Sequence, residues 1–139
     1  MLLDNNILLD FVLNRPPDPL AARELIHRIE TTATTAFVAW HSIATCYYIV
    51  QRDIDRTTAR NFIERLAGLL TVAPTSQESL LYALSLPMAD FEDAMQVAAA
   101  RAAGVGHIVT RDDRTRDARD FENSPIPTIT PEQAILELS

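Results

Sequence analysis

The hydrophobic positions of this chain fall into short runs and longer periodic stretches that alternate along the sequence. The short runs are rich in apolar and β-branched residues, as in strands buried on both faces. The longer stretches place apolar residues three and four positions apart, as on the inner face of a helix. The pattern predicts strands at 2–4, 35–40, 70–73, 107–110 and 127–130. It predicts helices at 5–14, 20–30, 41–52, 55–70, 74–87 and 90–103, and a closing helix that starts at Pro131.

Strands that alternate with helices favour an α/β fold with a mainly parallel sheet and right-handed crossovers. Asp55 and Asp90 stand where helix N-caps are expected, and Gly104 stands where a helix must end. The stretch 111–124 is the most polar of the chain, which predicts a loop or a frayed helix. Because neither a repeat nor a second domain is visible, residues 1–139 are expected to form one domain in which helices flank a short sheet.

The charged residues exclude several classes of enzyme mechanism. The net charge of −7 comes from 19 acidic and 12 basic residues, and every basic residue is an arginine. Without lysine, the chain does not suit a P-loop nucleotide hydrolase, a Schiff-base enzyme or a phospho-aspartyl domain, since each relies on a lysine ammonium group. An acidic total also disfavours non-specific coating of DNA, although local arginines and a metal ion can still bind a nucleic acid.

The sequence also predicts where the protein is located and whether it contains a disulfide bond or a metal-binding histidine motif. Charges break every apolar run within a few residues, and no export segment precedes Asp4, so we expect a cytoplasmic protein that does not enter the membrane. The single cysteine, Cys46, cannot form an internal disulfide. His27, His41 and His107 lack the spacing of a metal motif and are expected to be surface or packing residues.

The acids that follow predicted strands are the strongest chemical signal. Ligands of parallel α/β folds collect at the carboxyl ends of the strands, where Asp4 and Asp112 both fall. A carboxylate that follows two buried leucines needs a partner, which a metal ion or the free N–H groups of the next helix can supply. Asp113, Asp117 and Asp120 alternate with arginines, a pattern that favours an exposed loop.

Further acids open the helix predicted at 90–103. Asp90 fits an N-cap, and Asp93 fits an acid in the first turn. The rest of this helix is small and apolar apart from Gln96 and Arg101, so Asp93 is expected to lie near a buried surface and to need a partner. Asp10, on the first helix, is predicted to be a solvated acid.

Convergence of Asp4, Asp93 and Asp112 would create a cation site. Three carboxylates repel one another, and Mg²⁺ or Mn²⁺ offsets this repulsion because oxygen atoms are the ligands that these ions prefer. Such a metal activates water and neutralises the charge that grows on a phosphate. The predicted chemistry is therefore phosphodiester hydrolysis, which needs neither lysine nor cysteine.

The same residues resemble a known family. The segments Leu2–Asp10, Asp90–Ala94 before an alanine-rich helix, Ile108–Asp112, and Ile126-Pro127 with Thr130-Pro131-Glu132 are similar, in this order, to motifs of the PIN-domain ribonucleases. The resemblance covers nearly the whole chain. It implies a three-layer α/β fold with a short, mainly parallel sheet. It also implies an Mg²⁺- or Mn²⁺-dependent endoribonuclease, often the toxin of a toxin–antitoxin pair and usually a homodimer.

Carried over by position, the resemblance makes Asp4, Asp93 and Asp112 the metal-binding and catalytic residues. Supporting or substrate-binding roles fall to Asn6 beside Asp4, to Thr45 and Asp90, and to Thr110 and Arg111, the last of which would contact phosphate. One position departs from the family, which commonly has an acid where Thr45 stands. Threonine can order a water but cannot neutralise a cation, so another acid would have to substitute; the candidates are Asp10, Asp90, Asp117 and Asp120.

The departure at Thr45 leaves a second function open, that of a PIN-like module with little or no catalysis that binds RNA or a protein. A homodimer through the early helices would use the aromatic surface of Trp40, Tyr47 and Tyr48, which are equally suited to a core. An antitoxin would be a separate chain, basic where it meets the acidic pocket.

Overall fold

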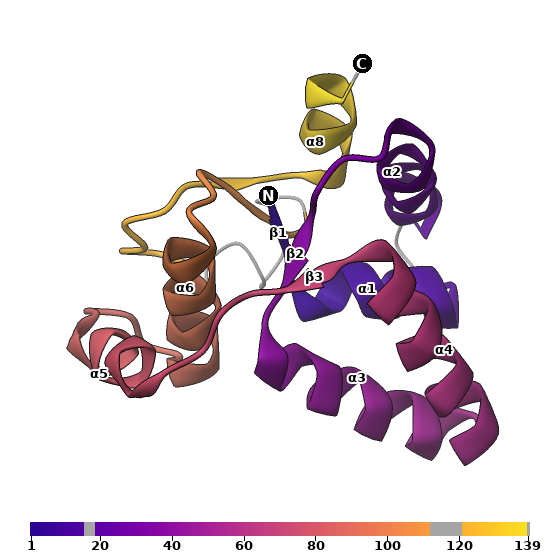
Figure 1. The fold of residues 1–139 in the computed structure, drawn as a ribbon, viewed down its shortest axis with the longest axis horizontal. Coiled ribbons are helices and arrows are strands. Elements are labelled where there is room, and N and C mark those ends of the chain that lie inside the picture. Colours follow the sequence, from indigo (N-terminus) through magenta and orange to yellow (C-terminus); the bar gives the residue numbers. More distant parts are fainter. Residues whose placement is uncertain (16–18, 112–120, 139) are drawn as a thin grey trace.

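The computed structural model of this chain describes residues 1–15, 19–111 and 121–138. A five-stranded sheet in the order β3-β2-β1-β4-β5 forms its centre, and every neighbouring pair of strands is parallel (Figure 1). The strands are β1 (Leu2–Leu3), β2 (Phe37–Val38), β3 (Thr71–Val72), β4 (Ile108–Val109) and β5 (Thr128–Ile129). The helices are α1 (Asn5–Leu13), α2 (Pro19–Thr32), α3 (Trp40–Asp53), α4 (Arg56–Leu69), α5 (Gln77–Ser85), α6 (Phe91–Ala103) and α8 (Pro131–Glu137). The predicted α/β fold is confirmed.

Successive residues of the strands face opposite sides of the sheet, and this alternation builds two cores. Leu3, Val38 and Val109 belong to the larger core, which α1, α2, α3, α4 and α8 cover. Leu2 and Ile108 belong to a second core beneath α6. Because both faces are buried, the central strands carry apolar residues at every position. The result is the expected three-layer arrangement of helices, sheet and helices.

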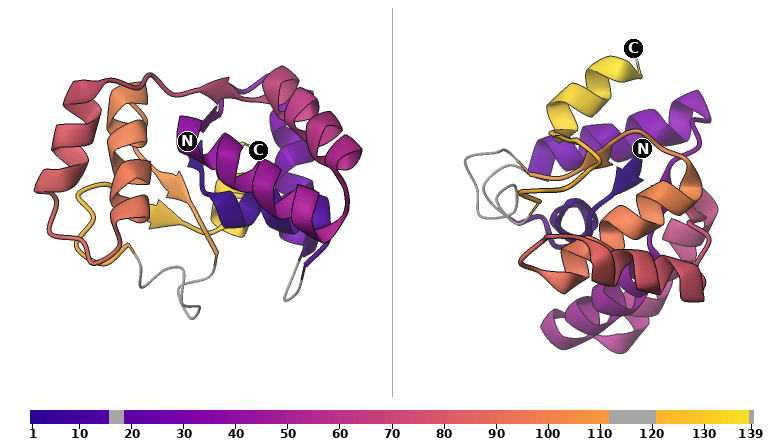
Figure 2. Two further views of the ribbon diagram at one scale, coloured as in Figure 1. Left: turned by 90° about the horizontal axis from the view of Figure 1, so that it is seen from below. Right: turned by 90° about the vertical axis from the view of Figure 1, so that its left-hand side faces the viewer.

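The helices form separate groups around the sheet. α5 packs against α6 and α3 packs against α4. In Figure 1 and in the left view of Figure 2, α5 and α6 lie to the left and α4 lies to the right, while the start of α3 hydrogen-bonds to α6 through Ser42 and Gln96. α1 contacts both α2 and α3, and α2 also contacts α8. The start of α1 also reaches α6, on the other side of the sheet, through the side chain of Asn5.

Local signals set the helix boundaries. Asp55 and Asp90 cap α4 and α6 as predicted, and each carboxylate accepts from the backbone N–H three residues later, at 2.6 and 3.0 Å. Thr130 begins α8 with a reciprocal capping box. Gly104 ends α6 with a φ of 71°, in the left-handed region that favours glycine.

Two features differ from the sequence prediction. Strands contain two residues instead of three to six, because α1 and α3 begin within two residues of the strands that precede them. α5 begins at Gln77 rather than at Pro74, because the side chain of Ser76 caps its first turn. Of the three aromatic residues considered for a dimer, Trp40 and Tyr48 are exposed, whereas Tyr47 packs against the larger core. Within the described ranges, every helix is too short or too polar to cross a membrane.

Candidate functional site

The carboxyl ends of β1 and β4 bring Asp4 and Thr110 together. The two strands pair with Leu3 opposite Val109, so the next residue of each strand lies at the same edge of the sheet. The N–H of Asp4 donates to the carbonyl of Val109 at 3.0 Å, and Oγ1 of Thr110 donates to Oδ2 of Asp4 at 3.0 Å. Asp4 is only 5% exposed and Thr110 only 1%. A buried carboxylate thus stands where the sequence placed an acid.

The first turn of α1 holds the other oxygen of Asp4. Oδ1 accepts from the N–H of Asn5 at 2.8 Å, so Asp4 is also the N-cap of α1. Nδ2 of Asn6 donates to Oγ1 of Thr110 at 3.2 Å, and Asn6 therefore supports Asp4 through Thr110. The Oδ1 atom of Asn6 is buried and has no hydrogen-bond partner among the described residues, which include the buried acid Asp4.

Asp90 and Asp93 occupy the start of α6. The carboxylate of Asp90 is exposed and caps the helix by accepting the N–H of Asp93, so its role here is at the helix start. Asp93 is half-buried in the first turn, as predicted from the apolar character of the helix. Gln96, almost one turn later, is fully buried. The start of α6 thus carries polar groups toward the interior.

A buried hydrogen-bond network links α6 to α1 and α3. Nε2 of Gln96 donates to Oδ1 of Asn5 at 2.9 Å and to Oγ of Ser42 at 2.7 Å. Nδ2 of Asn5 donates in turn to Oε1 of Glu92 at 2.7 Å. Four residues of this network are not among the site residues predicted from the sequence: Asn5, Ser42, Glu92 and Gln96. Of these, Gln96 alone has a signal in the sequence, as a polar residue in a helix of small apolar side chains.

Thr45 does not replace the acid that the resemblance places at its position. Its Oγ1 donates to the carbonyl of His41, one turn earlier in α3, at 3.2 Å. The hydroxyl is therefore engaged within its own helix, and it carries no charge.

The prediction that Asp10 is solvated is wrong. Asp10 is only 4% exposed, and its carboxylate accepts from Nε of Arg111 at 3.0 Å and from Nη2 at 2.5 Å. Nε of Arg15 lies 3.4 Å from the same carboxylate. The helix periodicity predicts that Asp10 lies on the first helix, but it gives no information on its partner Arg111, which lies 101 positions later in the chain. Arg111, expected beside phosphate, is held by Asp10 directly after Thr110.

Electrostatic effects converge on the start of α3. Burial lowers the pKa of His41, and the negative charge of Glu92 acts in the opposite direction. Burial raises the pKa of the Cys46 thiol to about 12, and the charges of Asp4 and Glu92 add to this increase. The same buried thiol is therefore influenced by a carboxylate at the end of β1 and by another from α6.

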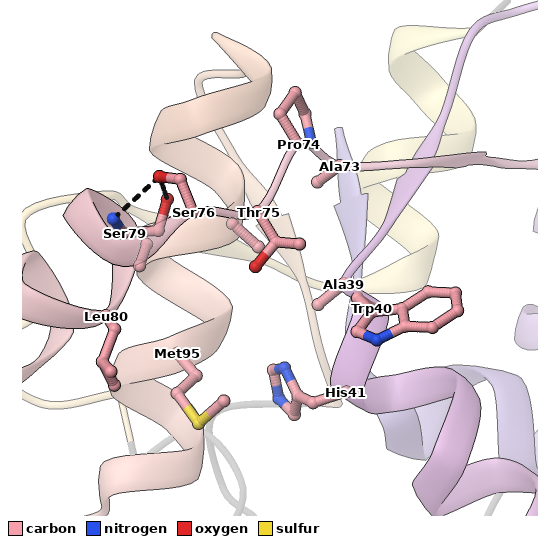
Figure 3. A pocket seen from close by; sticks show the side chains of 12 residues that line it. Ala39, Trp40, His41, Ala73, Pro74, Thr75, Ser76, Ser79, Leu80 and Met95 are labelled. Atoms are coloured by element: carbon pink, nitrogen blue, oxygen red, sulfur yellow. Dashed lines mark hydrogen bonds between the residues drawn. The ribbon is translucent and has the colours of Figure 1, made fainter.

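A pocket opens beside the network, between the start of α3 and the pair α5 and α6. Figure 3 shows His41 extending across it toward Met95, whereas the ring of Trp40 points away. Ser76 and Ser79 form part of its wall. His41 directly precedes Ser42 of the network, so this pocket adjoins the polar residues described above.

The predicted acids Asp112, Asp117 and Asp120 lie outside the described residues. In the part of the chain that the structure describes, no three Asp, Glu, His or Cys side chains are close enough to hold a metal ion. The convergence of Asp112 with Asp4 and Asp93 therefore stays a prediction.

The chain is similar to a known family of domains and to solved structures. Residues 1–114 match the sequence model of a PIN domain. The chain is similar to a solved structure of VapBC2 from Rickettsia felis bound to a DNA fragment from their promoter, with a TM-score of 0.70 and 14% identity over 93% of this chain and 96% of that one. It is also similar to FitAcB from Neisseria gonorrhoeae, with a TM-score of 0.60 and 16% identity over 94% and 97% of the two chains. No curated protein sequence matches it.

Proposed function

This chain belongs to the PIN domain family, and we propose that it is a divalent-metal-dependent endoribonuclease that acts as the toxin of a toxin–antitoxin pair. The observation that carries the proposal is Asp4, a buried carboxylate at the carboxyl end of a central parallel strand. This is the position at which α/β folds of this kind bind their ligands. The VapBC2 and FitAcB neighbours support the toxin role.

The residues present suit a hard divalent cation. Asp4 is buried, and the nearby Oδ1 of Asn6 has no donor within the part of the chain that the structure describes, so these surroundings favour positive charge. Asp4, Asp93 and Asp112 would hold the ion, all through the oxygen atoms that Mg²⁺ and Mn²⁺ prefer. When bound, the ion activates a water molecule and neutralises charge on the scissile phosphate.

The protein's own contribution is to fix these groups in advance. Thr110 and the N–H of Asn5 each hold one oxygen of Asp4, so this carboxylate is oriented before an ion or RNA arrives. Asp10 holds the guanidinium of Arg111 beside the end of β4. Arg111 thereby provides positive charge next to Thr110, where an RNA phosphate would approach the site.

The test compares metal binding with RNA cleavage in the same preparations. Mn²⁺ and Mg²⁺ binding are measured by calorimetry on the wild type, on Asp93→Asn and on Asp53→Asn, an exposed control on α3. Cleavage of a single-stranded RNA is measured with and without EDTA. We expect Asp93→Asn to lose binding and cleavage together and the control to keep both. A wild type that neither takes up metal nor cleaves RNA, freed of any inhibitor, would overturn the proposal.

The geometry of Thr45 favours a second candidate function. A site with fewer carboxylates binds cations weakly, and a PIN-like module of this kind would bind RNA or a protein without cutting it. In the same assay, RNA binding without metal uptake or cleavage would identify this alternative.

Partners follow from the proposed toxin role. We expect a separate antitoxin chain that is basic where it meets the acids around Asp4. We also expect a homodimer, which the exposed aromatic side chains of Trp40 and Tyr48 on α3 support. Light scattering on the wild type and on Trp40→Ser with Tyr48→Ser tests the dimer: the double variant should be a monomer, and an unchanged mass would refute this surface.

A further inference from the structure

The pocket beside His41 has apolar walls and a few polar groups. It lies between the start of α3, the segment that follows β3, and the helices α5 and α6 (Figure 3). Its apolar side chains are Ala39, Ala73, Leu80, Met95, Ala98 and Ala99. The hydroxyl side chains of Thr75, Ser76 and Ser79 line it as well. Mostly apolar walls with a few polar groups are typical of a site that binds a small organic group.

His41 brings an unpartnered hydrogen-bonding atom to this pocket. Its Nε2 is buried and has no hydrogen-bond partner among the residues that the structure describes. Figure 3 shows the imidazole extending across the pocket toward Met95. A buried polar atom without a partner costs free energy, and a ligand that hydrogen-bonds to Nε2 would remove this cost. The pocket and the unpartnered nitrogen are separate observations, and both point to a ligand with a hydrogen-bonding group.

The electrostatics around His41 favour a neutral ligand over a phosphate. Burial lowers the pKa of His41, so the imidazole is neutral at pH 7 and has one donor and one acceptor nitrogen. The carboxylate of Glu92 adds negative charge nearby. A phosphate would meet this negative charge, and a neutral imidazole offers it no compensating charge. A nucleic-acid base is uncharged, and its edge presents donors and acceptors that suit an imidazole.

The size of the pocket distinguishes between the two kinds of base. Its volume is about 100 Å³, which is less than the roughly 150 Å³ of a cavity that holds benzene. One six-membered ring can therefore enter with an edge left in solvent, whereas the fused rings of a purine exceed this space. The thioether of Met95 provides a polarisable surface against which such a ring packs favourably.

The pocket adjoins the proposed site. His41 immediately precedes Ser42, whose hydroxyl accepts from Gln96 at 2.7 Å, and Gln96 also donates to Asn5 at 2.9 Å. The backbone N–H of Asn5 donates in turn to Asp4 at 2.8 Å. One chain of hydrogen-bonded side chains thus joins the pocket to the carboxyl end of β1. A strand of RNA with a base in the pocket would lie next to the edge of the sheet that carries Asp4.

We propose that this pocket binds one pyrimidine base of a single-stranded RNA, with Nε2 of His41 hydrogen-bonded to the edge of the base and Met95 packed against its ring. The inference rests on the proposed nuclease function, because it names the base that would be recognised beside the cleaved bond. Binding of the base itself requires no metal ion. It can therefore be measured in EDTA, where metal-dependent cleavage does not occur.

Fluorescence anisotropy in EDTA tests the pocket. The probes are labelled oligouridylate and oligoadenylate of equal length, and the variants are His41→Leu and His27→Leu, the latter at an exposed histidine on α2. We expect the wild type to bind oligouridylate about fivefold or more tightly than oligoadenylate, and His41→Leu to remove this preference. His27→Leu should bind both probes as the wild type does. Equal affinity of the wild type for the two probes, or an unchanged preference in His41→Leu, would refute the proposal.

Thr75→Phe tests the same space from another element. Thr75 is exposed, precedes α5 and lies above His41 in Figure 3, so a phenyl ring at this position would fill part of the pocket. We expect this variant to lose the preference for oligouridylate and to keep the thermal midpoint of the wild type. Proton NMR of the histidine rings gives a readout without a label: oligouridylate should shift the signal of His41 and leave those of His27 and His107 in place. An unchanged His41 signal at saturation would refute the contact.

Cleavage assays with Mn²⁺ separate the failure of this inference from the failure of the proposed function. Cleavage by a wild type that shows no preference for oligouridylate in EDTA would refute the pocket and leave the nuclease proposal standing. A preference that depends on His41, without metal-dependent cleavage, would support the pocket and refute the nuclease. A wild type that neither binds nor cleaves RNA would refute both.

Discussion

Removal of the Asp10 carboxylate is the sharpest test of how the end of β4 is held. Asp10 on α1 accepts two hydrogen bonds from Arg111, which immediately follows the site residue Thr110. It also forms an ion pair with Arg15. Asp10→Ala would therefore leave two guanidinium groups without this acceptor and would release a contact between the first helix and the fourth strand.

The expected loss can be worked from the burial of the three side chains. Removing one partner of a buried ion pair costs about 3–5 kcal/mol, because the remaining charge is left unpaired. The side chain of Asp10 is 6% exposed, but those of Arg111 and Arg15 are 23% and 33% exposed, so water partly solvates the charges that remain. We therefore expect the lower end of this range, about 3 kcal/mol. For a chain of this size that corresponds to a drop of about 9 °C in Tm.

Urea unfolding followed by circular dichroism measures this loss directly. We expect a lower midpoint and an unchanged slope, which together indicate a change in stability rather than in the unfolded state. Asp53→Ala is the matched control, because Asp53 also pairs with an arginine on the same chain but at the surface. The midpoint of this control should be unchanged, since exposed ion pairs contribute little.

A double-mutant cycle identifies the interaction responsible. Asp10→Ala and Arg111→Met, alone and together, should show a coupling free energy of about 2 kcal/mol. A loss below about 1 kcal/mol in Asp10→Ala, or a coupling near zero, would mean that the buried pair does not hold the strand end and would refute the reasoning.

Three further predictions concern residues outside the proposed site. Because burial raises the pKa of Cys46 to about 12, its thiol should resist iodoacetamide at pH 8 in the folded protein and react only in urea, as mass spectrometry would show; rapid labelling without urea would contradict this. The hydrogen bond from the N–H of Thr58 lowers the pKa of Asp55, so the cap stabilises the fold above the ordinary aspartate value of 3.8 and loses this effect as the pH falls through the lowered pKa. The difference in thermal midpoint between the wild type and Asp55→Ala should thus be largest at pH 7 and decrease in strong acid, and a pH-independent difference would exclude a charge effect. Thr130→Ala should cost about 1 kcal/mol in urea unfolding through loss of the α8 capping box, and an unchanged midpoint would show that the box is not needed.

The elements of the fold were predictable because their signals are local. Apolar runs mark the strands, and caps such as Asp55 and Asp90 mark where helices begin. The rule that ligands gather at the carboxyl ends of parallel strands placed Asp4 at this edge, and the family resemblance placed Thr110 beside it. The strand lengths were overestimated, since an apolar residue beside a strand looks the same whether it continues the ladder or begins a helix.

The partners of polar residues were not predictable in the same way. Asp10 has the spacing of a solvated helix acid, and only the return of the chain to Arg111 makes it a buried one. Gln96 was recognisable as a polar residue in an apolar helix, but Asn5 and Ser42, which satisfy it, lie 91 and 54 positions earlier. Such pairings depend on which helix starts meet in space, and helical periodicity carries no information on that.

The question raised by Thr45 shows the consequence for inferring chemistry from a motif. A missing acid at one position was interpreted as a loss of charge, because a sequence motif assigns each role to one place along the chain. In the folded protein, the starts of α1, α3 and α6 meet through Asn5, Ser42 and Gln96, so residues of three helices surround this point. Glu92 lies one position before Asp93 and looks, in the sequence, like an ordinary acid in a first helical turn. Its hydrogen bond with Asn5 joins two elements that are 87 positions apart, and no single motif position reveals such a contact.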